Sequence, residues 1–262
     1  MSLATAETSR AVTILYRDES LVAVSKPSGL LVHRTELDRE RDVALQRVRD
    51  ALGQRVYPVH RLDRATSGVL VFALTPAVAG CLAASFRGRD VAKDYLAVVR
   101  GWAPETGEVD RPVPREKGGE KRPALTRFRR LATVELPIPV DRYPAARYSL
   151  VRVVPLTGRR HQIRRHMERV NHPLVGDTTY GHGPHNRLFR DHLDSHRLLL
   201  HAWRIAFPHP VDGTPCQITA SPPADFADVC AALGWPLSGL LADTGPVGGG
   251  AQADSRGNAA RG

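Results

Sequence analysis

The chain has 262 residues and carries 37 Lys and Arg against 27 Asp and Glu, a formal net charge of +10. This length suits one large domain or two small ones with a buried core, and the basic excess favours a polyanionic partner such as RNA or DNA. Three widely spaced cysteines argue against a disulfide framework and against a cysteine-based zinc site. The first ten residues contain no apolar signal region, and no apolar run approaches the roughly 18 residues of a membrane span. We therefore expect a soluble cytoplasmic protein without membrane contact.

The first third of the chain is expected to contain three short strands and two helices. Apolar residues at helical spacing, with charge between them, predict an amphipathic helix over 41–52. Pro76 opens a second helix that is expected to run to about Phe86 and to end at Gly88. Strands are expected at 12–16, 21–24 and 69–74, and the loop 26–33 (KPSGLLVH) follows the second strand.

The rest of the chain is expected to be richer in strands. The stretch 111–123 has Gly, Pro and basic residues without periodicity, which predicts a loop that either contacts a substrate or is a charged exposed insertion. The His-rich segment 182–196 is expected to be a loop as well. The further expected strands are 93–100, 124–131, 147–154, 198–207 and 216–220, and the further helices are 160–170 and 225–233.

Short strands interrupted by a few helices, without regular alternation of the two, predict an α+β fold around a mixed, largely antiparallel central sheet. We expect one domain over 12–240, and no internal repeat is present. Residues 241–262 are mostly Gly, Ala and polar residues of low complexity, so this tail and residues 1–11 are expected to be disordered.

The nonapeptide HRLDRATSG, residues 60–68, is the strongest candidate for chemistry. It places Asp63 between Arg61 and Arg64, and nearby positive charge favours the ionised form of a carboxyl group. An ionised aspartate in a basic setting can act as a nucleophile on an anionic polymer. The alternative is an aspartate that caps a turn and forms a structural ion pair.

The helix around TGRRHQIRRHMERV, residues 157–170, is the second candidate. Ile163, Met167 and Val170 share one face, which is expected to pack on the sheet. Arg164 falls at the border of that face, where an arginine can hold a carboxylate in a bidentate pair. On spacing alone the segment is also compatible with a plain basic surface helix. The arginines expected to be free for phosphates are Arg159, Arg165 and Arg169.

Tyr95 and the histidines each have two interpretations. Tyr95 lies in the alternating strand KDYLAVV and is either core filler or a ring that faces a cleft and stacks on a base. His182 with His185, and His192 with His196, have spacings that mimic zinc ligands. Cysteine partners are missing and arginines crowd the segment, so we expect no metal site and assign these histidines to phosphates or turns.

Four motifs in order resemble the RluA-type pseudouridine synthases. They are HRLDRATSG, KDYLAVV, TGRRHQIRRH at 157–166 and HPLVGD at 172–177, and LHAWRIAFPHP at 200–210 resembles the strand that follows them. The similarity covers about 12–240, with Ala65 where the family often has Pro. The resemblance implies the pseudouridine synthase fold and an isomerisation of uridine in RNA that needs neither a metal nor an organic cofactor.

The resemblance also implies roles for single residues. Asp63 matches the nucleophile, Tyr95 the tyrosine that stacks on the target base and takes part in proton removal, and Arg164 the arginine paired with the nucleophile. Arg61 matches the residue that fills the space of the flipped nucleotide, and Ile163 the apolar residue against the base. The other expected substrate-binding residues are His60, Arg64, Thr66, Arg159, His161 and Gln162.

The resemblance implies tRNA as the partner. The opening LVAVSKPSGLLVHRTELDR, the stretch RLATVELPIPVDRYPAARYSLV and the missing N-terminal S4-type domain are most similar to family members that modify uridine 65 of tRNA. Ribosomal RNA is the alternative substrate, since the catalytic motifs would be the same. A non-catalytic RNA-binding protein is the alternative from another class. We expect a monomer, because the sequence has no heptad run.

Overall fold

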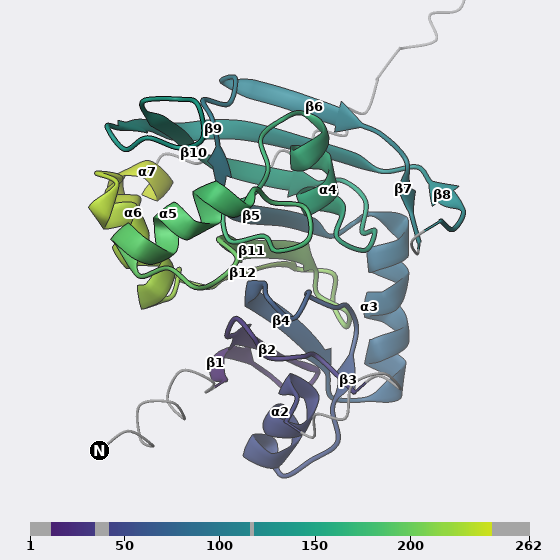
Figure 1. Ribbon diagram of the computed structural model, residues 1–262. Helices are drawn as coiled ribbons and strands as arrows, with labels where there is room; N and C mark the ends of the chain where they lie inside the picture. Colours follow the sequence, from purple (N-terminus) through teal and green to yellow (C-terminus); the bar gives the residue numbers. More distant parts are fainter. Residues whose placement is uncertain (1–11, 35–41, 116–117, 243–262) are drawn as a thin grey trace, which may run out of the picture.

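The computed structural model describes residues 12–34, 42–115 and 118–242 (Figure 1). The helices are α2 (Ala44–Leu52), α3 (Pro76–Gly88), α4 (Gln162–Arg169), α5 (Gly183–Leu193), α6 (Ala224–Ala232) and α7 (Leu237–Ala242). The strands are β1 (Thr13–Arg17), β2 (Leu21–Lys26), β3 (Tyr57–Pro58), β4 (Ser67–Ala73), β5 (Ala92–Arg100), β6 (Thr106–Asp110), β7 (Val113–Pro114), β8 (Lys121–Arg122), β9 (Leu125–Leu136), β10 (Ala146–Pro155), β11 (Leu200–Pro208) and β12 (Pro215–Thr219).

A ten-stranded sheet organises the described part of the chain (Figure 1). Its main path has the order β1-β2-β4-β11-β5-β10-β9-β6, with β3 paired to β4 and β12 paired to β11. β4 and β11 pair in parallel, and the other pairings of these strands are antiparallel. The α+β class with a mixed, largely antiparallel sheet is therefore confirmed.

The parallel pair β4–β11 joins the first third of the chain to the last. All seven residues of β4 are buried, as expected of a strand that has neighbours on both sides and cover on both faces. Segments far apart in sequence thus meet at the start of β4, immediately after the nonapeptide loop.

Helices cover both faces of the central strands. Side chains that alternate along β5 point to opposite faces of the sheet, so Leu96 and Val98 join one core cluster and Ala97 and Val99 join another. α4 packs Ile163 and Met167 into the second cluster, which confirms the apolar face expected for this helix. α5 and α6 supply Leu188, Phe189, Phe226 and Val229 to the first cluster, on the other face.

The expectation of a loop over 182–196 is wrong, because α5 occupies most of this segment. His185, Leu188 and Phe189 stand at i, i+3 and i+4 and are buried on one side of the helix, while its other positions are largely polar. Pro184 lies in the first turn, where its missing N–H costs nothing. The many His and Arg residues concealed this narrow apolar face in the sequence.

Other differences are smaller. The stretch 111–123 carries the short antiparallel pair β7–β8, in which Val113 is buried. β6 and α7 were not expected, and β9 runs on to Leu136. The expected tail 1–11 lies outside the described residues, as does the expected tail 241–262 except that Leu241 and Ala242 close α7. Among the described helices, none has the length and apolar character to cross a membrane.

Candidate active site

Hydrogen bonds from the end of β2 and from the residues that follow it hold the loop that carries Asp63. The ammonium group of Lys26 is buried and donates to the carbonyl oxygen of Arg64 at 3.1 Å, and the Ser28 hydroxyl donates to the carbonyl oxygen of Ala65 at 2.7 Å. Burial lowers the pKa of Lys26 to about 7. The loop 26–33 thus fixes the backbone on the C-terminal side of Asp63.

Close backbone approach explains the glycine at the end of the loop. Gly68 has φ +118°, and a Cβ atom there would lie 2.1 Å from the carbonyl oxygen of Ala202 on β11. Thr66 is buried, and its N–H donates to the carbonyl oxygen of Asp63 at 3.0 Å, which closes the turn. The close approach of β4 to β11 therefore requires glycine at position 68.

A buried polar network supports the same junction. The Ser67 hydroxyl lies 2.8 Å from His201 Nδ1 and accepts a hydrogen bond from Arg197 at 2.6 Å. His201 Nε2 lies 3.0 Å from the carbonyl oxygen of Ala220, which can only accept, so Nε2 carries the proton and Nδ1 accepts from Ser67. Burial lowers the pKa of His201 to about 4, in keeping with a neutral ring.

Asp63 itself faces a cleft with two basic side chains beside it. Its Oδ2 lies 3.6 Å from Arg164 Nη1 and its Oδ1 lies 3.8 Å from His161 Nε2, and 20% of its side chain is exposed. Both distances exceed hydrogen-bond length, so the carboxylate is attracted by positive charge yet remains open to a ligand. Its sequence neighbour Arg64 directs Nε to the carbonyl oxygen of Gly29 instead.

The bidentate partner of Arg164 is Asp177 rather than Asp63. Arg164 Nε and Nη2 donate to the two carboxylate oxygens of Asp177 at 2.6 and 2.8 Å, and both side chains are buried. Burial opposes the charge on Asp177, but the Arg164 hydrogen bonds and the N–H groups of Tyr180 and Thr179 outweigh it and lower the pKa of Asp177. This pair fixes the guanidinium group of Arg164 so that its remaining nitrogen, Nη1, points toward Asp63.

His161 is oriented by Tyr180. The Tyr180 hydroxyl accepts from Arg165 Nε at 2.8 Å and lies 3.2 Å from His161 Nδ1, so its own proton is available for that nitrogen. Neutral His161 then carries its proton on Nε2, the atom that faces Asp63. Burial lowers the pKa of His161, with Asp63 acting in the opposite direction.

Tyr95 lines the same cleft as Asp63. It comes from β5, is partly buried between two core clusters and lines a cleft of about 600 Å³ that also contains Asp63. Burial and the charge of Asp63 raise the pKa of the Tyr95 phenol, which keeps its hydroxyl protonated. The volume falls within the usual range for small-ligand sites.

The charged side chains that line the cleft are mostly positive. Among the described residues that line it, Asp63 is the single carboxylate. The lining cations come from the Asp63 loop, from the end of α3 and the start of β5, and from the approach to α4; they are Arg61, Arg87, Arg89, Lys93, Arg159, Arg160 and Arg164. A lining of this charge attracts phosphate groups and anionic polymers.

Four expected substrate-binding residues lie at the cleft but are engaged within the protein. His60 Nε2 accepts from the N–H of Val71 at 3.0 Å, its ring stacks on Phe86, and burial lowers its pKa to about 3. The Gln162 amide makes hydrogen bonds to Thr157, Arg159, Leu125 and Thr126. Thr66 and Ile163 are almost fully buried. These side chains shape the wall of the cleft.

Two of the arginines expected to be free for phosphates hold the basic stretch 111–123 instead. Arg165 Nη1 donates to the carbonyl oxygen of Pro114 at 2.8 Å, and Arg159 Nε donates to that of Pro123 at 3.1 Å. Both ends of the stretch are therefore tied to α4 and its approach, beside the cleft. Arg169 is exposed.

Sequence reasoning missed Asp177, Tyr180 and the cations of α3. Asp177 ends the motif HPLVGD and was therefore visible as a motif residue, but spacing gave no means of pairing it with Arg164. Arg87 of α3 and Arg89, which caps the C-terminal end of α3, both line the cleft, and their positions depend on how α3 packs in the tertiary structure. In the described residues, the one group of three close metal-ligating side chains lies outside the cleft.

A basic cleft in which Asp63 is the single carboxylate among the described lining residues, with Tyr95 beside it, is consistent with a protein that acts on a nucleic-acid base. The family model for RNA pseudouridylate synthase matches residues 20–169, which include Asp63, Tyr95 and Arg164. The chain belongs to the RNA pseudouridylate synthase family, whose members are isomerases of RNA.

Individual relatives agree with this assignment over most of the chain. The tRNA pseudouridine synthase C of Vibrio cholerae is 45% identical over 239 residues, covering 87% of this chain and 98% of that protein. The protein of the same name from Pasteurella multocida is 45% identical over 238 residues, again covering 87% and 98%. The solved structure of human RNA Pseudouridylate Synthase Domain Containing 1 has a TM-score of 0.66 at 26% identity, covering 90% of this chain and 97% of that one.

Proposed function

We propose that this protein is a tRNA pseudouridine synthase that isomerises uridine 65, with Asp63 as the nucleophile. The observation that carries the proposal is the placement of Asp63 as the single carboxylate among the described residues of a basic cleft. The relatives named tRNA pseudouridine synthase C, at 45% identity over almost their whole length, support tRNA as the substrate. Ribosomal RNA remains the second candidate, because the same cleft would serve it.

The target uridine must leave the RNA helix before it can reach Asp63. Extrusion costs a few kcal/mol for unstacking and unpairing. Arg61 is exposed at the lip of the cleft, where its guanidinium can take the place of the flipped base and offset part of that cost. Tyr95 then offers its ring for stacking, and Ile163 lies in the wall of the same cleft.

Asp63 starts the isomerisation in its ionised form. It attacks C1′ of the ribose or C6 of the base, or it assists formation of a glycal. In each route the N1–C1′ bond breaks, the uracil turns, a C5–C1′ bond forms and the proton of C5 is lost while N1 gains one. Arg164 Nη1 lies 3.6 Å from Asp63 Oδ2 and places positive charge beside the carboxylate. The raised pKa of Tyr95 means that its hydroxyl can accept the C5 proton only by passing its own proton on.

No step of this reaction calls for a metal or an organic cofactor, and we expect the enzyme to act as a cytoplasmic monomer. A non-catalytic RNA-binding protein would account for the basic charge equally well. It would not need Asp63, Arg164 and Tyr95 gathered in one cleft, and the family to which the chain belongs consists of isomerases.

The proposal is tested with purified protein and tRNA transcripts that carry uridine tritiated at C5. The wild type should release tritium from a wild-type transcript and much less from one with cytidine at position 65. Asp63→Asn should bind the transcript with unchanged affinity and release at least about a thousandfold less tritium, since the amide is not a nucleophile. Release by Asp63→Asn near the wild-type rate would disprove the nucleophile assignment, and release from a ribosomal RNA fragment alone would move the substrate to the second candidate.

A further inference from the structure

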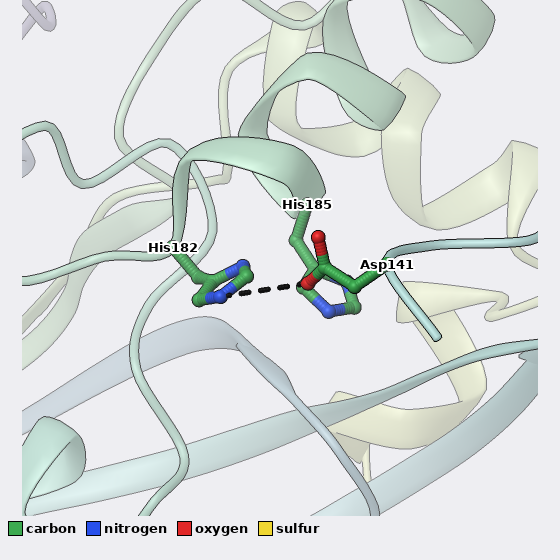
Figure 2. Close-up of side chains that lie close together, drawn as sticks. All are labelled: Asp141, His182 and His185. Atoms are coloured by element: carbon green, nitrogen blue, oxygen red, sulfur yellow. Dashed lines mark ion pairs between the residues drawn. The ribbon is translucent and has the colours of Figure 1, made fainter. Parts of the chain in front are cut away.

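Three side chains with metal-ligating atoms converge away from the cleft. His182 precedes the first residue of α5, His185 follows one helical turn later, and Asp141 comes from the turn between β9 and β10 (Figure 2). None of the three lines the cleft. His182 and His185 lie three residues apart at the start of a helix, so their rings project to the same side.

The spacing of the ligand atoms fits one small cation. One candidate atom from each of the three residues lies within 4.8 Å of the other two, and Asp141 Oδ2 is 3.6 Å from His182 Nε2. Around a tetrahedral zinc ion with bonds of about 2.0–2.1 Å, neighbouring ligand atoms are about 3.4 Å apart. The Asp141–His182 separation therefore exceeds hydrogen-bond length but is close to a ligand-to-ligand distance.

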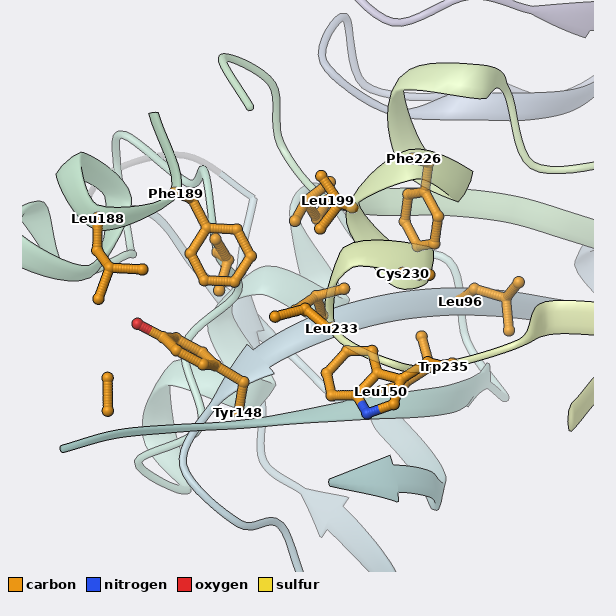
Figure 3. Close-up of a cluster of buried hydrophobic side chains, with 14 of the residues drawn as sticks. Leu96, Tyr148, Leu150, Leu188, Phe189, Leu199, Phe226, Cys230, Leu233 and Trp235 are labelled. Carbon is orange, nitrogen blue, oxygen red and sulfur yellow. The ribbon is translucent and has the colours of Figure 1, made fainter. Parts of the chain in front are cut away.

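The surroundings of His185 prepare its ring for ligation. Its Nδ1 lies 2.8 Å from the Tyr148 hydroxyl, which leaves Nε2 to be offered to a cation. A hydrogen bond on the far nitrogen is the usual support of a metal-bound histidine, because it fixes the ring and its tautomer. Tyr148 is itself held in the apolar cluster beside Leu188 and Phe189 of α5 (Figure 3). Burial, Arg100 and His182 lower the pKa of His185 to about 4, so the ring is neutral.

His182 directs Nε2 toward Asp141. Its Nδ1 atom is buried and has no hydrogen-bond partner among the described residues, so no protein group fixes the tautomer and Nε2 can be the unprotonated nitrogen that binds an ion. Its side chain as a whole is 36% exposed and that of Asp141 is 46% exposed. An ion can therefore enter from solvent, and water can complete its coordination.

We propose that Asp141, His182 and His185 bind one divalent transition-metal ion, with Zn²⁺ as the best chemical fit. Two imidazoles and a carboxylate are ligands that zinc accepts readily, whereas Mg²⁺ and Ca²⁺ prefer oxygen ligands alone. The ion ties the turn around Asp141 to the start of α5. The next residue of α5, Asn186, donates to the carbonyl oxygen of Asp177 and accepts from the N–H of Gly176, so the site adjoins the support of Arg164.

The test uses the full chain without a histidine tag, freed of metal with a chelator and then dialysed. Calorimetric titration with Zn²⁺ should show one ion bound per chain and a raised unfolding temperature. Co²⁺ should give the intense visible absorption of a four-coordinate site. His182→Ala and Asp141→Asn should each weaken Zn²⁺ binding about tenfold or more and remove the Co²⁺ absorption.

A matched control lies in the same part of the chain. His196 Nε2 and Asp194 Oδ1 form an exposed pair at 3.0 Å for which the described residues offer no third ligand, so His196→Ala should leave Zn²⁺ binding unchanged. Failure of the wild type to bind Zn²⁺ would overturn the proposal. Full Zn²⁺ affinity in His182→Ala or in Asp141→Asn would also overturn it. Either result would show that the substituted residue does not bind the ion.

Discussion

At the scale of single residues, the account depends on how Arg164 is held. Its bidentate pair with buried Asp177 fixes the guanidinium, and the one nitrogen left over faces Asp63 at 3.6 Å. An arginine bound in this way positions charge beside Asp63, the proposed nucleophile, without covering it. Asp177 is thus a positioning residue, which acts on the reaction through Arg164.

Asp177→Asn should lower kcat more than it raises KM. The substitution leaves Arg164 buried and only partly paired, a change that costs about 3–5 kcal/mol of stability in comparable buried pairs. The freed guanidinium can then close on Asp63 and block it. Steady-state kinetics on tRNA, with thermal unfolding alongside, measures both effects. Glu135→Gln is the control, because the exposed Glu135–Arg147 pair should contribute at most about 1 kcal/mol. An unchanged kcat in a folded Asp177→Asn protein would contradict this role.

At the scale of elements, the junction of β4 and β11 determines where the Asp63 loop ends. Gly68→Ala should destabilise the protein by more than about 3 kcal/mol, because the new Cβ atom would overlap the Ala202 carbonyl and φ is positive. Gly80→Ala should instead stabilise it by about 0.5–1 kcal/mol, since Gly80 lies inside α3 with open space around it. Urea unfolding compares the two, and equal effects would show that the close approach at Gly68 is not required.

The elements of the catalytic motifs were predictable because local patterns specify them. The helix face of Ile163 and Met167 and the strand that carries Tyr95 follow from periodicity, and the structure has both. α5 was not predictable in this way. Its buried residues are His185, Asn186, Leu188 and Phe189, of which only two are apolar, and Phe189 packs against Tyr148, a partner distant in sequence.

The other features that the sequence did not predict are pairings between residues distant in sequence. The sequence suggested that Arg164 holds a carboxylate, but only tertiary structure distinguishes Asp177 from Asp63 as the bidentate partner. In the same way, the spacing of His182 and His185 was visible, and the expectation of no metal site rested on missing cysteines. Asp141 lies in the turn between β9 and β10. No local sequence pattern predicts that this turn brings Asp141 close to the two histidines.

At the scale of the whole molecule, buried neutral histidines should make the protein sensitive to acid. Burial lowers the pKa of His185 and His201 to about 4, whereas an unfolded histidine has a pKa of about 6.5. Between these values the unfolded chain binds protons that the folded protein does not. The free energy of unfolding should therefore fall as the pH falls from about 6.5 to about 4, by up to about 1.4 kcal/mol per pH unit for each histidine.

Urea unfolding at a series of pH values, with chelator present, measures this dependence. His201→Gln should flatten the pH dependence, since one titrating group is removed. His196→Gln should leave the dependence as it is, because the His196 side chain is 65% exposed. A wild-type stability that does not change between pH 4 and 6.5 would contradict the neutral, buried state of these rings.

The most direct test of the central claim is base-resolution mapping of pseudouridine in tRNA from cells that lack this gene. The account predicts that pseudouridine disappears at position 65 alone, that the wild-type gene restores it, and that the Asp63→Asn gene does not. Pseudouridine that persists at position 65 without the gene, or that returns with Asp63→Asn, would contradict it.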